Sequence, residues 1–158
     1  MRRLLKDELY KHMTLDPDIV VISLDLGMGM FDEIRENYSS RFFNVGAAEQ
    51  AGMDMAVGMA LAGKKPFVYS ITNFLLYRPF ETLRNYINHE EIPVRLVASG
   101  RDYDYEHDGI SHWSQDARAV LDVLPNIIQY WPKNEGGVKR AIKSMVRTDE
   151  PQFISLRR

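Results

Sequence analysis

Three parts of the sequence carry side chains that could do chemistry. Glu49 lies in the first turn of a predicted helix, an aromatic cluster contains Phe74, Tyr77 and Phe80, and His112 follows a glycine closely. A carboxyl group that faces a flat apolar surface, with a titratable histidine nearby, suits a heteroaromatic cofactor and acid–base chemistry. Simpler interpretations stay open at this point: an acid in a first turn complements the helix dipole, and Phe74 and Tyr77 could be ordinary core residues.

Other common motifs are absent or incomplete. The acidic loop that starts at Asp102 has His107 at the sixth position and Trp113 at the twelfth, where a calcium loop needs glycine and glutamate. His107 and His112 are too irregularly placed for a familiar zinc site. No G-x-G-x-x-G follows a strand, and there is no Walker loop. The sequence therefore predicts no metal site built by this chain.

Composition bounds the class of protein. The 158 residues, 45% of them hydrophobic, are enough for one domain with its own core, which we place at 1–158. A net charge of -2 gives no electrostatic case for nucleic acid. The absence of cysteine excludes disulfides and thiolate nucleophiles and fits a reducing compartment. No segment reads as a signal peptide or a membrane span, so we expect a cytoplasmic protein.

Strand and helix patterns alternate along the whole chain. Apolar, β-branched runs predict strands, and amphipathic or alanine-rich runs predict helices. The pattern predicts an α/β three-layer sandwich, with a mostly parallel sheet of about six strands flanked by helices. The expected strands are 19–25, 42–45, 65–71, 92–100, 126–131 and 152–156, and the expected helices are 2–13, 31–38, 48–62, one from 73 onward that Pro79 interrupts, 113–122 and 135–147, capped by Asn134.

The residues with chemical potential fall where ligands bind in such a sheet. Ligands of parallel sheets lie beyond the carboxyl ends of the strands. The segments expected there are 25–29, 46–50, 70–78 and 99–112, which hold Glu49, Phe74 and His112. The pattern therefore predicts that one edge of the sheet collects all three.

Three segments, taken together and in order, resemble the pyrimidine-binding domain of the transketolase family of thiamine-diphosphate enzymes. They are RFFNVGAAEQ at 41–50, SITNFLLYRPFETLR at 70–84, and DGISHWSQD at 108–116. The similarity covers nearly the whole chain, and the first and third motifs are the more specific ones. The order and spacing of the three carry the resemblance, which implies the thiamine-diphosphate-binding fold of the pyrimidine type.

The resemblance implies roles for the residues around the cofactor. Glu49 matches the glutamate that hydrogen-bonds the pyrimidine N1′ and so helps to activate the cofactor. Phe74 matches the aromatic residue that stacks on the pyrimidine, and Tyr77, one turn on, is expected to close the same pocket. Ile71 stands where many relatives have another aromatic residue. Asp25 corresponds loosely to a family acid beside the cofactor.

The resemblance also implies contacts with a sugar substrate. His112 matches the active-site histidine of the D-G-x-T/S-H segment, which contacts the substrate or the covalent intermediate. Asp108 matches the acid that hydrogen-bonds a sugar hydroxyl. We expect Arg78 and Arg84 to tie the domain interface instead of touching substrate.

Departures from the family pattern point to a divided enzyme. The sequence lacks the G-D-G…N segment that holds Mg²⁺ and the diphosphate, and it lacks the C-terminal transketolase domain. The resemblance therefore implies that a diphosphate-binding subunit supplies the Mg²⁺ ligands, in a hetero-oligomer, with self-association also open. Gly52, Ala56 and Ala60 recur every four residues, so we expect this face of helix 48–62 to be the packing surface.

The expected activity is transfer of a two-carbon ketol unit between a ketose-like donor and an aldose-like acceptor. Two other thiamine-diphosphate activities stay open: the β-like subunit of a 2-oxoacid dehydrogenase, and a deoxyxylulose-phosphate synthase-like protein. A different class of protein, a non-catalytic domain of the same fold, also stays open. The presence of Glu49, Phe74 and His112 together argues against a domain that has lost its catalytic site.

Overall fold

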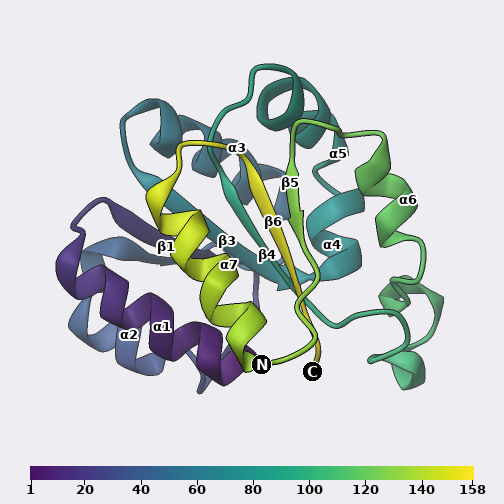
Figure 1. Ribbon diagram of the computed structural model, residues 1–158, viewed down its shortest axis with the longest axis horizontal. Helices are drawn as coiled ribbons and strands as arrows, with labels where there is room; N and C mark the ends of the chain where they lie inside the picture. Colours follow the sequence, from purple (N-terminus) through teal and green to yellow (C-terminus); the bar gives the residue numbers. More distant parts are fainter.

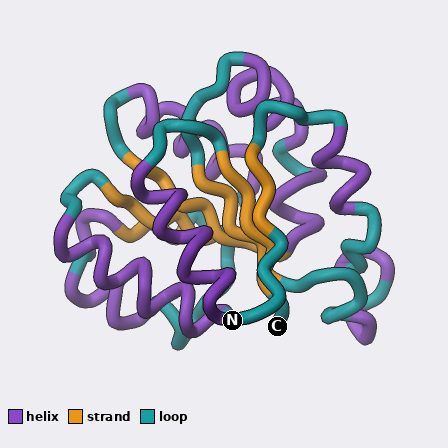
Figure 2. Tube along the Cα trace, viewed as in Figure 1, coloured by secondary structure: helices purple, strands orange, loops and turns teal.

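A computed structural model describes all residues, 1–158, and has a single sheet between two layers of helices (Figures 1 and 2). None of its helices combines the length and the apolar character needed to cross a membrane. The strands are β1 (Ile19–Ser23), β2 (Phe42–Asn44), β3 (Lys65–Ile71), β4 (Arg95–Ser99), β5 (Ile128–Tyr130) and β6 (Gln152–Leu156). The α-helices are α1 (Arg2–Leu15), α2 (Asp32–Asn37), α3 (Glu49–Leu61), α4 (Thr72–Tyr77), α5 (Phe80–Thr82), α6 (Ala117–Asp122) and α7 (Glu135–Arg147). Short 3₁₀ turns are η1 (Ser39–Arg41), η3 (Glu106–Asp108) and η4 (Ile110–His112), and η2 (Leu83–His89) is π-helical.

The sheet has the strand order β2-β1-β3-β4-β6-β5, and every neighbouring pair is parallel. Each crossover runs through a helix, so all six strands end at the same edge of the sheet. This confirms the predicted α/β three-layer sandwich, and the sheet is wholly parallel. Since β1 lies between β2 and β3, the segments that follow these three strands are neighbours at the carboxyl end of the sheet.

Successive strand residues feed two separate cores, because side chains alternate across the sheet. Ile22 packs with α3, α4, η2 and α6 on one face, whereas Val21 packs with α1, α2 and α7 on the other. In Figure 1 helices α1, α2 and α7 lie together on one side of the sheet, and α4 and α6 lie on the other. The four inner strands, β1, β3, β4 and β6, are buried on both faces, which explains why their sequences are nearly continuous apolar runs instead of alternating ones.

Several elements follow the sequence closely. Strands β3 and β6 and helix α7 have the predicted bounds, and the Asn134 side chain accepts a hydrogen bond of 2.9 Å from the Gly137 amide at the start of α7. The helix expected from Asn73 onward is broken at Pro79 into α4, α5 and the π-helical η2. Proline has no amide proton to continue the helix, so the break falls where the sequence places it.

The prediction that the small-residue face of α3 packs against a partner is wrong. Gly52, Ala56 and Ala60 are buried within this chain, and a side chain added at Gly52 would collide with Leu24 and Val45. The small residues instead let α3 lie close to its own sheet. The four-residue spacing identified a closely packed face but not the element that covers it.

A buried arginine ties the end of α7 to the start of β4. The Arg95 side chain is 0% exposed, and it donates to the carbonyl oxygens of Met145 at 2.9 Å, Pro93 at 2.5 Å and Thr148 at 2.8 Å. These carbonyls lie at the end of a helix and in a loop, where the backbone has no ladder partner. One guanidinium thus satisfies three backbone groups that folding would otherwise leave unpaired.

Replacing Arg95 with methionine should therefore destabilise the chain strongly. The apolar stem would still pack, but one buried and two partly buried carbonyls would lose their donor, so we expect a loss of about 3 kcal/mol or more in the free energy of unfolding. Urea denaturation followed by circular dichroism measures this change. The matched control is Arg147→Met, at an exposed position of the same region, which should change stability by about 0.5 kcal/mol or less. Equal effects of the two substitutions would contradict the assigned role of Arg95.

Candidate functional site

The carboxyl edge of the sheet collects the residues that the sequence singles out. Glu49 is the first residue of α3, which follows β2, and Phe74 lies in α4, which follows β3. His112 ends η4, in the long connection that follows β4. Gly46, at φ +70°, makes the turn that takes the chain from β2 toward α3. Three separate crossovers therefore deliver one functional side chain each.

Glu49 is buried and pairs with an arginine from the next crossover. The Glu49 side chain is 5% exposed, and its Oε1 accepts a hydrogen bond of 2.5 Å from Arg78 Nη1. The same guanidinium lies over the Phe74 ring, with 3.7 Å from its Cζ to the ring centroid. Arg78 thus bridges the carboxylate and the aromatic face. The predicted place of Arg78 was a domain interface, and its contact with Glu49 was not predicted.

The Phe74 ring also contacts His112. Their ring centroids are 4.9 Å apart and the rings are inclined by 69°, an edge-to-face arrangement. His112 Nδ1 lies 2.9 Å from the Ser111 hydroxyl, and a second ring, that of Tyr105, lies 6.2 Å from the imidazole. Arg78 thus links Glu49 to Phe74, and Phe74 contacts His112. The sequence pattern predicted that Glu49, Phe74 and His112 gather at this edge of the sheet.

Asn73, next to Phe74, fixes the backbone on both sides of His112. Its Nδ2 donates to the carbonyl oxygens of Ser111 at 3.2 Å and Trp113 at 2.5 Å. Asn73 is buried, and its Oδ1 has no hydrogen-bond partner. Both hydrogens of the Asn73 amide group are therefore donated to the segment that carries His112. No sequence pattern predicts this contact, because the two carbonyl partners lie 38 and 40 residues from Asn73.

Tyr77 lies in an open groove beside Phe74. The groove has a volume of about 370 Å³. The Tyr77 hydroxyl donates to Asp116 Oδ2 at 2.5 Å. Burial, and then the hydrogen bond and negative charge of Asp116, raise the pKa of Tyr77 to about 12. Tyr77 therefore stays neutral near pH 7. The residues that line the groove are Asn73, Phe74, Tyr77, Arg78, Ile110, Ser111, Trp113, Gln115 and Asp116.

The other predicted site residues lie at the same edge without joining these contacts. Asp25 follows β1, with φ +55°, and its amide donates to Asn44 Oδ1 at 3.3 Å. Ile71 is buried at the junction of β3 and α4. Asp108 Oδ2 lies 3.2 Å from His107 Nε2, and no hydrogen bond or ion pair joins Asp108 to His112. Their assigned roles remain predictions.

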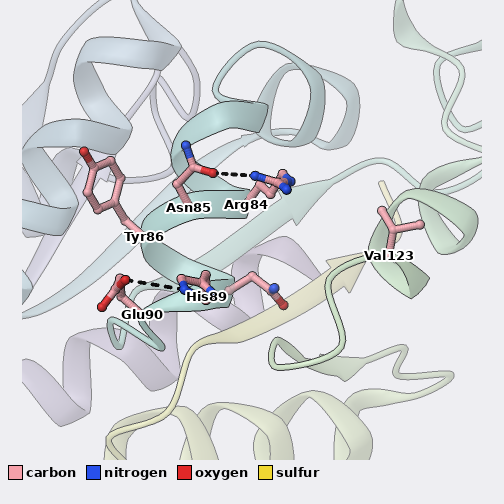
Figure 3. Close-up of a pocket in the computed structure, with 7 residues that line it drawn as sticks. Arg84, Asn85, Tyr86, His89, Glu90 and Val123 are labelled. Atoms are coloured by element: carbon pink, nitrogen blue, oxygen red, sulfur yellow. Dashed lines mark hydrogen bonds and ion pairs between the residues drawn. The ribbon is translucent and has the colours of Figure 1, made fainter.

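A larger hollow lies away from these residues. It has a volume of about 680 Å³ and is bordered by η2 and by Val123, just after α6 (Figure 3). Its charged groups pair locally: Arg84 donates to Asn85 at 2.8 Å, and His89 lies 3.8 Å from Glu90. Because His89 and Glu90 precede β4, the hollow faces the amino ends of the strands. It shares no lining residue with the groove beside Phe74.

The family model for the pyrimidine-binding domain of transketolase matches residues 1–158, the whole chain. The chain belongs to this family. Groups of three or more histidine and acidic side chains that could hold a metal ion are absent from this pyrimidine-binding domain.

Relatives and solved structures of this domain include parts of divided enzymes. A Methanocaldococcus jannaschii protein, provisionally named as a transketolase C-terminal section, is 29% identical over 89% of this chain, which spans 45% of that protein. The 1-deoxy-D-xylulose-5-phosphate synthase of Halothermothrix orenii is 33% identical over 76% of this chain and 19% of its own length. A structure described as a split gene transketolase, inactive beta4 tetramer, superposes with a TM-score of 0.87 at 28% identity, over 99% of this chain and 51% of that one.

Membership of the family implies thiamine diphosphate as the cofactor, and the residues present fit its pyrimidine ring. The planar guanidinium of Arg78 contacts both the carboxylate of Glu49 and the face of the Phe74 ring. One planar group therefore fits between these two side chains. A flat ring that carries a hydrogen-bonding nitrogen in its plane matches this pair in shape and in polarity. The pyrimidine-binding domain thus supplies one polar and one apolar contact suited to the ring.

The role of Asn73 can be tested by hydrogen exchange. In an Asn73→Ala variant the carbonyls of Ser111 and Trp113 lose their donor, so we expect the amides of His112, Trp113 and Ser114 to exchange about tenfold faster or more. Exchange of the β3 and β4 amides should stay unchanged. Asn85→Ala, which removes an amide in the distant hollow, is the matched control. Unaltered exchange at 112–114 in Asn73→Ala would contradict the role of Asn73 in fixing the backbone around His112.

Proposed function

We propose that this chain is the pyrimidine-binding subunit of a split transketolase-like enzyme. It would help to transfer a two-carbon ketol unit from a ketose-like donor to an aldose-like acceptor. The observation that carries this proposal is the meeting of a buried Glu49, Phe74 and His112 at the carboxyl edge, in a chain that the family model matches from end to end. The similarity to a transketolase C-terminal section and to a split gene transketolase supports the division into subunits.

Each residue has a role that its environment suits. Glu49 would hydrogen-bond the ring nitrogen N1′, and its burial keeps water from competing for that bond. Phe74 would stack on the pyrimidine ring. His112, half-buried against Phe74, would contact the substrate and hold or release a proton, and Asp108 would bind a sugar hydroxyl. When bound, thiamine diphosphate supplies a carbon nucleophile that attacks the donor carbonyl.

The proposal requires a partner subunit. The 158 residues hold no G-D-G…N segment. In this proposal a diphosphate-binding chain supplies the ligands of Mg²⁺ and of the diphosphate, and the similarity to a split gene transketolase supports that arrangement. The active site would then lie between the two chains, next to the groove that Tyr77 and Trp113 line. A hetero-oligomer is the expected active form, and self-association of this chain is compatible with it.

Calorimetry with thiamine diphosphate and Mg²⁺ tests the division of the site. This chain alone should bind the whole cofactor too weakly for calorimetry to detect, because it has contacts for the pyrimidine ring and none for the charged diphosphate. After co-expression with a chain that carries a G-D-G…N segment, binding should be saturable and dependent on Mg²⁺. Tight binding by this chain alone would mean that the diphosphate site has been assigned to the wrong chain.

Substitutions in the reconstituted pair separate catalysis from structure. Glu49→Gln should lower turnover about a hundredfold or more, since it removes the ionisable group at N1′, and His112→Asn should lower turnover about a hundredfold while leaving cofactor affinity close to that of the wild type. A non-catalytic domain of the same fold would instead show no change with Glu49→Gln except in stability. Turnover is measured with a coupled ketol-transfer assay, and circular dichroism checks that each variant is folded.

A second activity is favoured by one observation, the 33% identity to a deoxyxylulose-phosphate synthase. In that case the same residues would serve a 2-oxoacid donor, as they also would in a dehydrogenase β-like subunit. A donor screen that compares ketoses with pyruvate separates these activities. Ketol transfer from ketoses, without consumption of pyruvate, is the outcome that the present proposal expects.

A further inference from the structure

The guanidinium of Arg78 makes two contacts, and both are to groups that the proposed function assigns to the cofactor ring. Its Nη1 donates to Glu49 Oε1 at 2.5 Å, and its Cζ lies 3.7 Å from the centroid of the Phe74 ring. A guanidinium is planar, donates hydrogen bonds within its plane and stacks on aromatic faces. An aminopyrimidine that bonds the same carboxylate and stacks on the same ring needs the same space.

We propose that Arg78 sets the affinity of this site for the cofactor: its guanidinium holds the place of the aminopyrimidine ring and leaves when the ring binds. The inference rests on the proposed function, because that function assigns Glu49 and Phe74 to the ring. It assigns Arg78 to the cofactor site itself, in place of the domain interface that the sequence suggested.

The burial of Glu49 explains why such a substitute is needed. A carboxylate this buried is costly unless it is paired and hydrogen-bonded. Arg78 provides the pair in the cofactor-free chain. In the bound state a proton shared between the carboxyl group and the ring nitrogen replaces it, because the carboxylate and the ring nitrogen are both acceptors. Since one oxygen and one ring face serve both, the arginine and the aminopyrimidine bind in competition.

The surroundings of Arg78 let it leave. Its side chain is 46% exposed, and Glu49 is the only hydrogen-bond partner of its guanidinium. Arg101, at the same edge of the sheet, is the opposite case: it is buried and donates to Ser155 and to the Pro132 carbonyl. Arg101 is fixed by its bonds, whereas Arg78 can turn into water once Glu49 has another partner.

The test uses the full chain alone and the aminopyrimidine half of the cofactor, 4-amino-5-hydroxymethyl-2-methylpyrimidine. Binding is followed by NMR titration of the labelled chain. We expect Arg78→Ala to bind this ring about tenfold more tightly than the wild type, because the ring no longer displaces a stacked and paired guanidinium. The matched control is Arg84→Ala, which removes the same charge in the distant hollow and should bind like the wild type.

A thermal readout supports the same test. Without the ring, Arg78→Ala should melt at a lower temperature than the wild type, because Glu49 loses its partner. With the ring at saturation, its melting temperature should rise by more than that of the wild type. Should Arg78→Ala fail to fold, Arg78→Lys carries the test: it keeps the charge but loses the planar group, so we expect a few-fold gain in affinity.

The outcomes separate the two proposals. Binding of the ring to the wild type, with equal or weaker binding to Arg78→Ala, would overturn the role of Arg78 and leave the proposed function standing. Binding to neither chain, at concentrations up to the solubility limit, would mean that this chain alone has no site for the ring between Glu49 and Phe74, and the role of Arg78 would be overturned. The proposed function is then decided separately, by calorimetry of the co-expressed pair.

Discussion

The carboxylate of Glu49 must be kept out of water and still be paired, and the arrangement of the site follows from this requirement. Helix α3 begins at Glu49, so the acid lies at the positive end of that helix. Its own crossover supplies no cation at this point: the charge comes from Arg78, after the next strand. The pairing depends on β2, β3 and β4 succeeding one another in the same direction across the sheet, because right-handed crossovers that run in one direction lie on one face. The order of the strands therefore decides whether the buried acid is tolerable.

Helix α4 gives this pairing a rigid base. It follows β3 without an intervening loop, and Thr72 hydrogen-bonds the carbonyls of Ser99 and Gly100 at the end of β4. Asn73 then holds the backbone around His112, and Phe74 lies between that histidine and Arg78. Three consecutive residues thus join three segments. A site held by strand ends and helix starts keeps its geometry better than one carried by loops alone.

The sequence predicted the sheet well because burial on both faces leaves a simple pattern. Ile19–Ser23 and Lys65–Ile71 are apolar runs of strand length, and each is followed by a helical segment. Pro79 marked the break in the helix after β3, since its chemistry acts locally. The small residues of α3 were harder to interpret: their spacing reports close packing, but a spacing alone does not say whether the neighbour is the chain's own sheet or another chain.

The site was predictable where a motif names a residue, and not where residues meet only through folding. Glu49, Phe74 and His112 stand in recognisable segments, whereas the hydrogen bonds of Arg78 and Asn73 join residues that are 29 to 40 positions apart in the sequence. These unpredicted contacts are polar. A polar side chain can hydrogen-bond to water, to the backbone or to another side chain, and only the tertiary structure decides which partner it has. For Arg78 the choice has a consequence for energy. By satisfying Glu49 it allows the chain to fold with a binding site already shaped, and the cofactor ring then has to compete with a group of its own size and flatness.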